Sequence, residues 1–120
     1  MNPWDEIQQR CPRLYRNEIF FECGIGWANI ISDLSDKIER ILEKKDDERE
    51  MFAVQVKEKY GTLRFYMSCE TDEIFDLIRD TEALSSQTCE VCGRHAKMRH
   101  TRWIRWIEVR CDECYNDKKP

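Results

Sequence analysis

Histidine, glycine and proline are scarce in this chain, and it contains no long apolar run. Two histidines, four glycines and three prolines occur among 120 residues. Both histidines, His95 and His100, lie in the C-terminal third, so the first 88 residues offer no imidazole for general acid–base catalysis. No segment approaches the roughly 20 apolar residues that a membrane-spanning helix needs. Residues 1–6 are acidic and lack the apolar core of a signal peptide.

These absences favour a cytoplasmic protein with no membrane partner. The length suits one compact domain, or a small domain carrying a metal-held appendage. A hydrophobic content of 41% is sufficient for a core. Seven cysteines in a cytoplasmic chain indicate metal ligands and buried thiols, because a reducing compartment does not favour a disulfide framework.

Four of the cysteines have the spacing of a zinc ribbon. Cys89, Cys92, Cys111 and Cys114 form the pattern C-x2-C-x18-C-x2-C. Gly93 follows the first pair, where a tight turn favours positive φ. Zinc held by four thiolates is tetrahedral and has no open position for substrate, so the pattern predicts one structural Zn²⁺. We expect a ribbon over residues 87–117, with two knuckles at the ends of a β-hairpin, and a tail over 118–120.

Charge is divided unevenly between the two parts of the chain. The net charge is −4, but residues 1–88 carry 12 Lys and Arg against 19 Asp and Glu. Residues 89–120 carry 8 basic residues against 5 acidic ones. An acidic body over residues 1–86 repels nucleic acid, whereas the basic ribbon could contact it.

The body has the periodicities of an α+β domain. Asn2 and Thr71 are expected helix N-caps, and Gly24 and Gly26 end a strand before a helix that begins near Trp27. We expect a small antiparallel sheet with helices on one face, followed by the ribbon. The predicted elements are a helix over 3–10, a strand over 18–23, a helix over 27–42, a hairpin of strands 52–57 and 63–67, and a helix over 72–84.

Apolar spacing assigns the buried face of each element. Phe52, Val54 and Val56 alternate and are expected on one face of the first hairpin strand. The two longer helices each have one apolar stripe. The stripes are Trp27, Ile30, Ile31, Leu34, Ile38, Ile41 and Leu42 in the first, and Ile74, Leu77, Ile78, Thr81 and Leu84 in the second.

Three segments resemble a family of small phage and prophage proteins. Residues 21–27, FECGIGW, resemble its FE-x-G-x-GW segment, and residues 54–66, VQVKEKYGTLRFY, resemble its QVKEKFGTLRFY segment. Residues 89–93, CEVCG, continue the likeness, which covers most of residues 11–114. The resemblance implies a mobile-element setting, in which small accessory proteins bind and disable host machinery in the host cytoplasm. It supplies no catalytic residues.

The motifs that suggest catalysis are weak. Gln55 and Lys57 resemble the Q-x-K variant of a metal-dependent nuclease motif, which needs an acidic ligand such as Asp46, Asp47 or Glu50. An outward-facing strand is the simpler interpretation. His95 and His100 could belong to a zinc-stapled HNH nuclease, but the eighteen-residue insert is short for one, and exposed ribbon residues are expected instead.

Other sites have a plain structural interpretation beside a functional one. Gly24 and Gly26 could bind an anion at the start of the following helix, although a strand-to-helix turn needs no ligand. Cys11, Cys23 and Cys69 are expected to be buried thiols, because a second metal site would need a fourth ligand.

Aromatic and arginine side chains are the candidate contact residues, because these types dominate interfaces and also stack on bases. At least one of the two ribbon tryptophans is expected to pack inward. The candidates are Tyr60, Arg64 and Tyr66 on the hairpin, and Arg102, Trp103, Arg105 and Trp106 on the ribbon.

The sequence supports three hypotheses and leaves the oligomeric state open. The first is a non-enzymatic zinc-containing protein, phage-encoded, that binds and inhibits a host macromolecule, with a host protein as the favoured partner. The second is a nucleic-acid-binding regulator, and the third is a metal-dependent nuclease. The second requires one continuous basic patch formed by Arg94, Lys97, Arg99, Arg102, Arg105 and Arg110.

Overall fold

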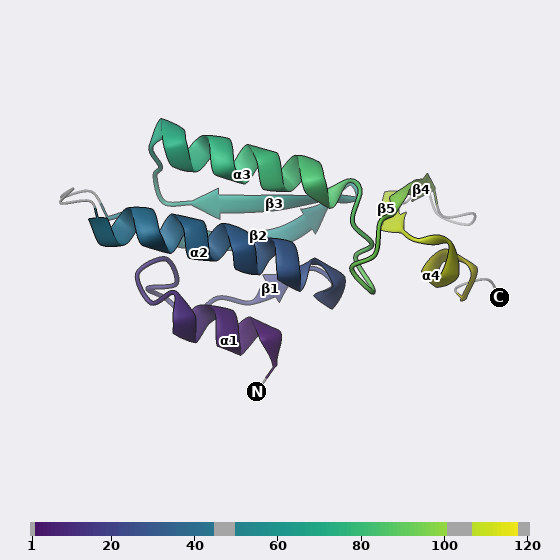
Figure 1. Ribbon diagram of the computed structural model, residues 1–120, viewed down its shortest axis with the longest axis horizontal. Helices are drawn as coiled ribbons and strands as arrows, with labels where there is room; N and C mark the ends of the chain where they lie inside the picture. The colour runs from purple at the N-terminus through teal and green to yellow at the C-terminus, as the bar shows by residue number, and fades with distance from the viewer. Residues whose placement is uncertain (1, 45–49, 101–106, 118–120) are drawn as a thin grey trace.

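The computed structural model describes residues 2–44, 50–100 and 107–117. Within these ranges, a body of helices and a mixed sheet is followed by a ribbon of two strands and a short helix (Figure 1). In chain order the elements are α1 (Pro3–Arg10), β1 (Phe21–Glu22), η1 (Ile25–Trp27), α2 (Ala28–Lys44), β2 (Ala53–Lys59), β3 (Thr62–Met67), α3 (Asp72–Ser85), β4 (Lys97–His100), β5 (Ile107–Arg110) and α4 (Asp112–Asp117).

Helices α1 and α3 begin where the capping residues predict. Asn2 accepts a hydrogen bond from the backbone nitrogen of Asp5 at 2.9 Å, and Pro3 occupies the first helical turn of α1. Thr71 caps α3 by accepting from the nitrogen of Ile74 at 3.3 Å. These bonds satisfy backbone donors that a helix leaves unpaired at its start. No helix in the described ranges has both the length and the apolar character needed to cross a bilayer.

The expected α+β class is confirmed, but the body sheet, of order β1-β2-β3, is mixed rather than antiparallel. Strands β2 and β3 form the predicted hairpin, turning at Tyr60 and Gly61, both with positive φ. Strand β1 pairs with β2 in parallel, because the chain crosses over through α2 between them.

Strand β1 is also shorter than the six residues predicted. The Gln8 side chain in α1 binds both backbone groups of Ile19, accepting from its nitrogen at 3.1 Å and donating to its oxygen at 3.2 Å. Ile19 therefore takes its hydrogen bonds from a helix side chain, and strand pairing is limited to Phe21 and Glu22.

A bulge in β2 overturns the predicted alternation of its apolar residues. The register with β3 shifts between Ala53 and Gln55. Ala53 and Val56 consequently point inward, with 1% and 0% of their surface exposed, whereas Val54 is 53% exposed. Because the bulge adds one residue to β2, Val54 lies on the opposite face of the strand from the one expected.

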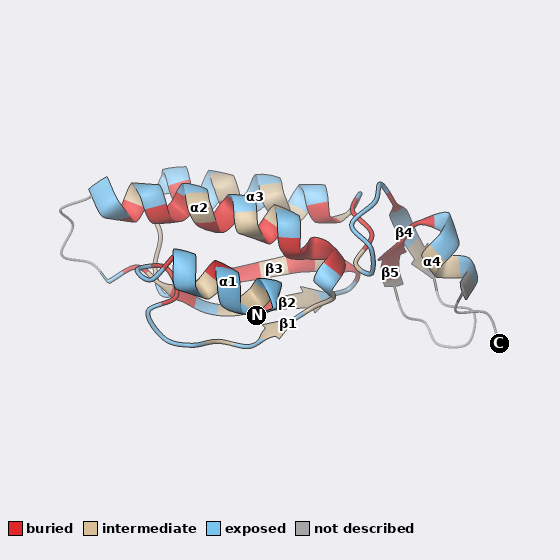
Figure 2. Ribbon diagram, turned by 60° about the horizontal axis from the view of Figure 1, so that its bottom comes forward, coloured by how far each residue is buried: buried red, intermediate tan, exposed pale blue. Residues whose placement is uncertain are grey.

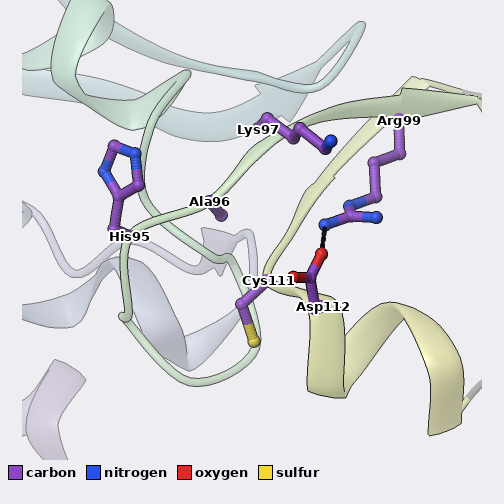
Figure 3. A pocket seen from close by; sticks show the side chains of 6 residues that line it. All are labelled: His95, Ala96, Lys97, Arg99, Cys111 and Asp112. Carbon is purple, nitrogen blue, oxygen red and sulfur yellow. Dashed lines mark hydrogen bonds and ion pairs between the residues drawn. The ribbon is translucent and has the colours of Figure 1, made fainter.

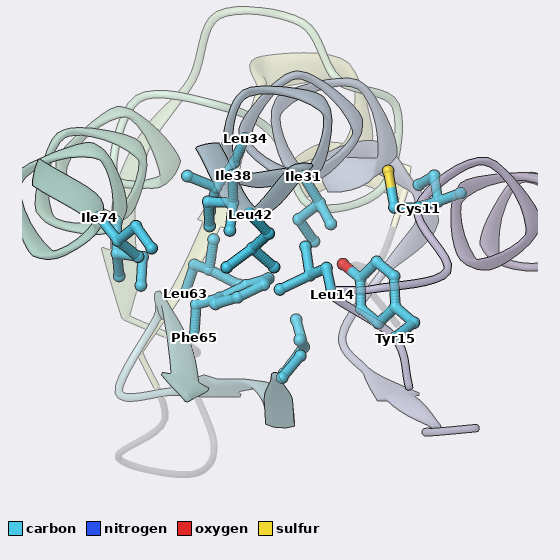
Figure 4. Packing of buried hydrophobic residues seen from close by; sticks show 14 of the residues in the cluster. Cys11, Leu14, Tyr15, Ile31, Leu34, Ile38, Leu42, Leu63, Phe65 and Ile74 are labelled. Atoms are coloured by element: carbon cyan, nitrogen blue, oxygen red, sulfur yellow. The ribbon is translucent and has the colours of Figure 1, made fainter. Parts of the chain in front are cut away.

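The core lies between the sheet and the helices, which cover one face only (Figures 2 and 4). Helix α2 contributes the largest share. The predicted stripe is confirmed: Trp27 at the end of η1 and Ile31, Leu34, Ile38 and Leu42 in α2 are buried, with Ile30 and Ile41 at the margin. Residues Leu63 and Phe65 from β3 meet this stripe from the sheet (Figure 4).

Helix α3 protects the outer edge of β3. Leu84, expected in the core, is 48% exposed, and Ser85 is fully buried in its place. The Ser85 hydroxyl accepts from the nitrogen of Leu63 at 2.9 Å, and the Glu82 carboxylate accepts from the nitrogen of Phe65 at 3.0 Å. These bonds satisfy edge donors that would otherwise invite another strand.

Two buried polar groups anchor the segment after α1. The carboxylate of Glu39 accepts from the nitrogens of Leu14 at 2.8 Å and Arg13 at 3.2 Å. The hydroxyl groups of Tyr15 and Ser35 lie 2.6 Å apart. Both contacts join the segment to α2 in the interior, where unpaired groups are costly.

The three cysteines of the body differ in exposure. Cys11 is fully buried, as expected, whereas Cys23 and Cys69 are half-buried. The Cys11 thiol donates to the Asp36 carboxylate at 3.5 Å. Burial raises the pKa of Cys11 and of Cys23 to about 12. Both thiols therefore remain protonated and unreactive near neutral pH.

Candidate metal centre

Four cysteine sulfurs converge in the ribbon. The first two, Cys89 and Cys92, lie in the turn before β4, while Cys111 follows β5 and Cys114 lies in α4. Their Sγ atoms all lie within 4.8 Å of one another, and those of Cys92 and Cys111 are 3.5 Å apart. A tetrahedron with metal–sulfur bonds of about 2.3 Å has sulfurs about 3.8 Å apart. The four sulfurs are therefore close enough to hold a metal ion after small adjustments.

The first knuckle closes through its own backbone. Gly93 donates from its nitrogen to the oxygen of Cys89 at 2.9 Å, and Cys89 donates to the oxygen of Arg94 at 2.7 Å. Gly93 has a φ of 84°, so the conformation expected from the sequence is confirmed. The glycine lets the chain reverse within the knuckle and brings both sulfurs to one side.

The second knuckle is built on a helix that sequence reasoning missed. Cys111 precedes α4, and Cys114 lies within it. The nitrogen of Cys114 donates to the Cys111 sulfur at 3.5 Å. The sequence does contain a signal for this helix: Asp112 and Glu113 follow Cys111 directly, and acidic residues favour the first turn of a helix.

The local backbone favours thiolate at Cys89. Burial by itself raises the pKa of this fully buried thiol, but the nearby amides of Cys111, Cys92 and Val91 lower it to about 6. Burial and the neighbouring thiols raise the pKa of Cys114 to about 12. A divalent metal displaces the remaining protons when it binds. Four thiolates suit Zn²⁺, and this ligand set would make it a structural ion.

The first knuckle is seated on the body through Glu90, which lies between two of the cysteines. Gly26 donates from its nitrogen to the Glu90 backbone oxygen at 2.8 Å, and Gly24 donates to the Glu90 carboxylate at 2.7 Å. An internal carboxylate therefore fills the position at the start of α2 where the sequence allowed an external anion. Trp27 adds a third bond, from its indole nitrogen to the oxygen of Thr88 at 2.8 Å.

A buried charge network lies behind this contact. The Arg110 guanidinium contacts the carboxylates of Glu90 at 3.3 Å and Glu108 at 2.9 Å. The side chains of Arg110 and Glu90 are only 10% and 12% exposed. Because Arg110 lies directly before Cys111 of the cysteine cluster, the network connects both knuckles to the body.

The six basic residues proposed for nucleic-acid contact do not form one free patch in the described ribbon. Arg94 pairs with Glu113, Arg99 pairs with Asp112, and Arg110 is buried. Arg99 also lies over the Tyr115 ring, 4.6 Å from its centroid. Lys97 is exposed. Arg102 and Arg105, like Trp103 and Trp106, lie outside the described residues, so the expectation for a buried tryptophan is not tested.

A hollow of about 200 Å³ lies beside the metal centre (Figure 3). His95, Lys97, Arg99 and Asp112 line it, together with Ala96 and the ligand Cys111. The Asp112 carboxylate, the one carboxylate among these described residues, is bound by Arg99. His95 is exposed, as expected; the side chain of His100 lies outside the description. Among the described residues that line the hollow, no second carboxylate accompanies the histidine.

The nuclease motif does not assemble in the described residues. Gln55 donates to the Glu22 carboxylate at 2.9 Å on the sheet surface, and Glu50 pairs with Arg16 at 2.9 Å. Asp46 and Asp47 lie outside the described ranges. Within those ranges, the ribbon cysteines are the one cluster of three or more suitable side chains close enough to bind a metal ion.

The hairpin contact candidates are accessible. Tyr60 is 69% exposed at the turn, Tyr66 is 43% exposed, and Arg64 is half-buried.

Comparison of the chain with protein-family models, curated proteins and solved structures gave no match in any of the three.

Proposed function

We propose that this is a non-enzymatic, zinc-containing binding protein in which the metal holds the ribbon at one position on the acidic body. The observation that carries the proposal is the placement of Glu90. It lies between ligands Cys89 and Cys92 and is hydrogen-bonded to Gly24 and Gly26 of the body. A closed four-thiolate site supplies stability rather than a reactive water, which supports a structural use of the metal.

The partner in this proposal is a host protein, which the chain binds and inhibits in the host cytoplasm. The phage setting rests on the resemblance of residues 21–27 and 54–66 to phage and prophage proteins. The acidic body supports a protein partner over nucleic acid, because it repels a polyanion. The engagement of Arg94, Arg99 and Arg110 within the ribbon supports the same choice.

Capture from bacterial host lysate tests this function. Tagged, metal-loaded protein is incubated with lysate, with and without nuclease, and a Cys92→Ser variant serves as the metal-site control. The proposal is supported if a defined protein is recovered after nuclease treatment and if adding the purified chain lowers the activity of that protein. Recovery of nucleic acid alone, lost on nuclease treatment, would replace it with the nucleic-acid regulator.

A further inference from the structure

One face of the body sheet is covered by no described helix. Two positively charged side chains lie opposite each other on this face. Val56 and Phe65 are paired across β2 and β3 and point into the core, 0% and 3% exposed. Their neighbours in the same strands, Lys57 and Arg64, are paired as well and therefore project from the opposite face. That face is free of helices in Figure 2.

Three residues form one row across this open face. Glu22 in β1 is the pairing partner of Lys57, which is in turn the partner of Arg64. Glu22 accepts its hydrogen bond from Gln55 rather than from Lys57. Within the described residues, neither Lys57 nor Arg64 has an ion-pair partner. Two like charges directly opposite each other destabilise a sheet, so an external anion would relieve their repulsion.

Apolar surface adjoins this pair of cations. Tyr66 is two residues beyond Arg64 on the same face, paired with Gln55, and is 43% exposed. Val54, in the bulge beside Gln55, is 53% exposed. Aromatic and arginine side chains beside exposed aliphatic surface are typical of protein interfaces.

The hairpin that forms this face also adjoins the ribbon at its turn. A Cβ atom added at Gly61 in the hairpin turn would lie 2.8 Å from the Ile107 side chain of β5. The hairpin that carries Lys57 and Arg64 therefore abuts the metal-held ribbon at its turn.

We propose that this open face docks the protein partner through an acidic segment. One partner carboxylate binds between Lys57 and Arg64, and a neighbouring apolar side chain covers Tyr66 and Val54. Opposed residues of paired strands have Cβ atoms about 5 Å apart, so both cations reach one carboxylate. The exposed apolar surface of Tyr66 and Val54 beside the two cations favours an acidic peptide with an apolar side chain over a nucleic acid. This inference rests on the proposed function and names the chemistry of the partner.

The test is a titration of ¹⁵N-labelled, metal-loaded protein with the blocked peptide Glu-Glu-Leu-Glu-Glu. We expect saturable shifts of the amide signals of Lys57, Arg64 and Tyr66 that weaken as salt is added. The peptide Gln-Gln-Leu-Gln-Gln is the uncharged control, and decathymidylate is the nucleic-acid probe. Shifts spread over the whole surface, shifts insensitive to salt, or tighter binding of decathymidylate on this face would each overturn the proposal.

A pair of matched variants locates the binding. The double change Lys57→Gln and Arg64→Gln removes both cations of the row. Lys37→Gln and Arg40→Gln removes the same charge from exposed positions on α2. We expect at least a tenfold loss of peptide affinity in the first variant and less than a twofold change in the second. Equal losses of peptide affinity in the two variants would overturn the proposed docking site.

Thermal stability shows whether Lys57 and Arg64 serve in binding or in holding the fold. Neutralising the row should leave the melting temperature equal or slightly higher, because the two like charges no longer face each other. A large fall in melting temperature together with lost binding would mean that the cations hold the fold. Lysate capture distinguishes the two proposals: a host protein retained equally by the Lys57/Arg64 variant overturns this surface and leaves the proposed function standing.

Discussion

The backbone nitrogen of Gly26 donates to the backbone oxygen of Glu90 at 2.8 Å, across 64 positions of sequence. This bond joins η1, directly before α2, to the first cysteine knuckle. The contact is between main chains, so it depends on how closely the two segments approach. Glycine at position 26 permits that approach because it has no Cβ atom.

Gly26→Ala should therefore separate the ribbon from the body. The added Cβ would lie 2.2 Å from the Cys89 oxygen and 2.5 Å from the Glu90 carbonyl carbon, both main-chain atoms that cannot rotate away. We expect a loss of about 1–3 kcal/mol in the free energy of unfolding, together with weaker metal binding. Urea unfolding and titration with a competing chelator measure the two effects.

Ile25→Ala is the control for this change. It removes a side chain that is 47% exposed in the same turn, and introduces no clash. It should cost less than about 1 kcal/mol and leave metal affinity unchanged. A Gly26→Ala protein that matched this control in both measurements would contradict the close packing of knuckle and body.

The Glu90 side chain provides a second prediction. Glu90→Ala removes the acceptor of the Gly24 nitrogen and leaves the buried Arg110 without one of its two carboxylates. Breaking a buried ion pair from one side costs about 3–5 kcal/mol. Because Glu90 is 12% exposed and Arg110 keeps Glu108, we expect a loss of about 2–3 kcal/mol, measured by urea unfolding.

Glu90→Gln separates hydrogen bonding from charge. The amide oxygen can still accept from Gly24, so this variant should lose only about half as much stability as Glu90→Ala. Equal losses in the two variants would show that the charge, rather than the hydrogen bond, holds the knuckle on the body.

Much of the fold could be predicted because its signals are local. The Asn2 and Thr71 caps, the stripe of α2 and the Tyr60–Gly61 turn are each specified within a few residues. The cysteine spacing likewise predicts the metal centre, since two knuckles need little beyond a turn and a strand pair.

The remaining features depend on partners distant in sequence. The burial of Ser85 follows from the unpaired edge of β3, 22 residues away, which only the folded sheet reveals. The bulge at Val54 depends on the register with β3. The role of Gly24 and Gly26 required knowledge of Glu90, and a strand-to-helix turn gives no sign of it.

Loss of the metal should free the ribbon and spare the body. Cys92→Ser removes one of four ligands, so metal content should fall from one equivalent toward zero. Hydrogen exchange should then accelerate at the amides of Gly24 and Gly26, which bond to the knuckle, while β2 and β3 keep their protection. Elemental analysis and exchange mass spectrometry measure these outcomes.

Cys69→Ser is the matched control, since it alters a half-buried thiol outside the cluster. It should retain one equivalent of metal and wild-type exchange. Full metal content in Cys92→Ser would show that Cys92 is not a ligand. Uniform acceleration over the whole chain would show that the body needs the ribbon to fold.

The buried thiol of Cys11 should make the protein less stable in alkali. Burial raises its pKa from 9.0 to about 12, and the Asp36 carboxylate beside it acts in the same direction. Above pH 9 the unfolded chain releases this proton while the folded chain keeps it. Stability is therefore complete below pH 9 and falls as pH rises toward 12, by up to about 1.4 kcal/mol per pH unit.

Cys11→Ala should flatten this dependence. The variant loses packing at every pH, but its free energy of unfolding should fall less steeply between pH 9 and 10.5 than that of the wild type. Tyr15→Phe should flatten the curve at higher pH, because burial raises the pKa of the Tyr15 hydroxyl as well. The comparison requires metal-loaded protein throughout, so that the ribbon thiolates contribute equally to each curve. Parallel curves for wild type and Cys11→Ala would mean that the Cys11 thiol ionises as readily in the folded protein as in the unfolded chain.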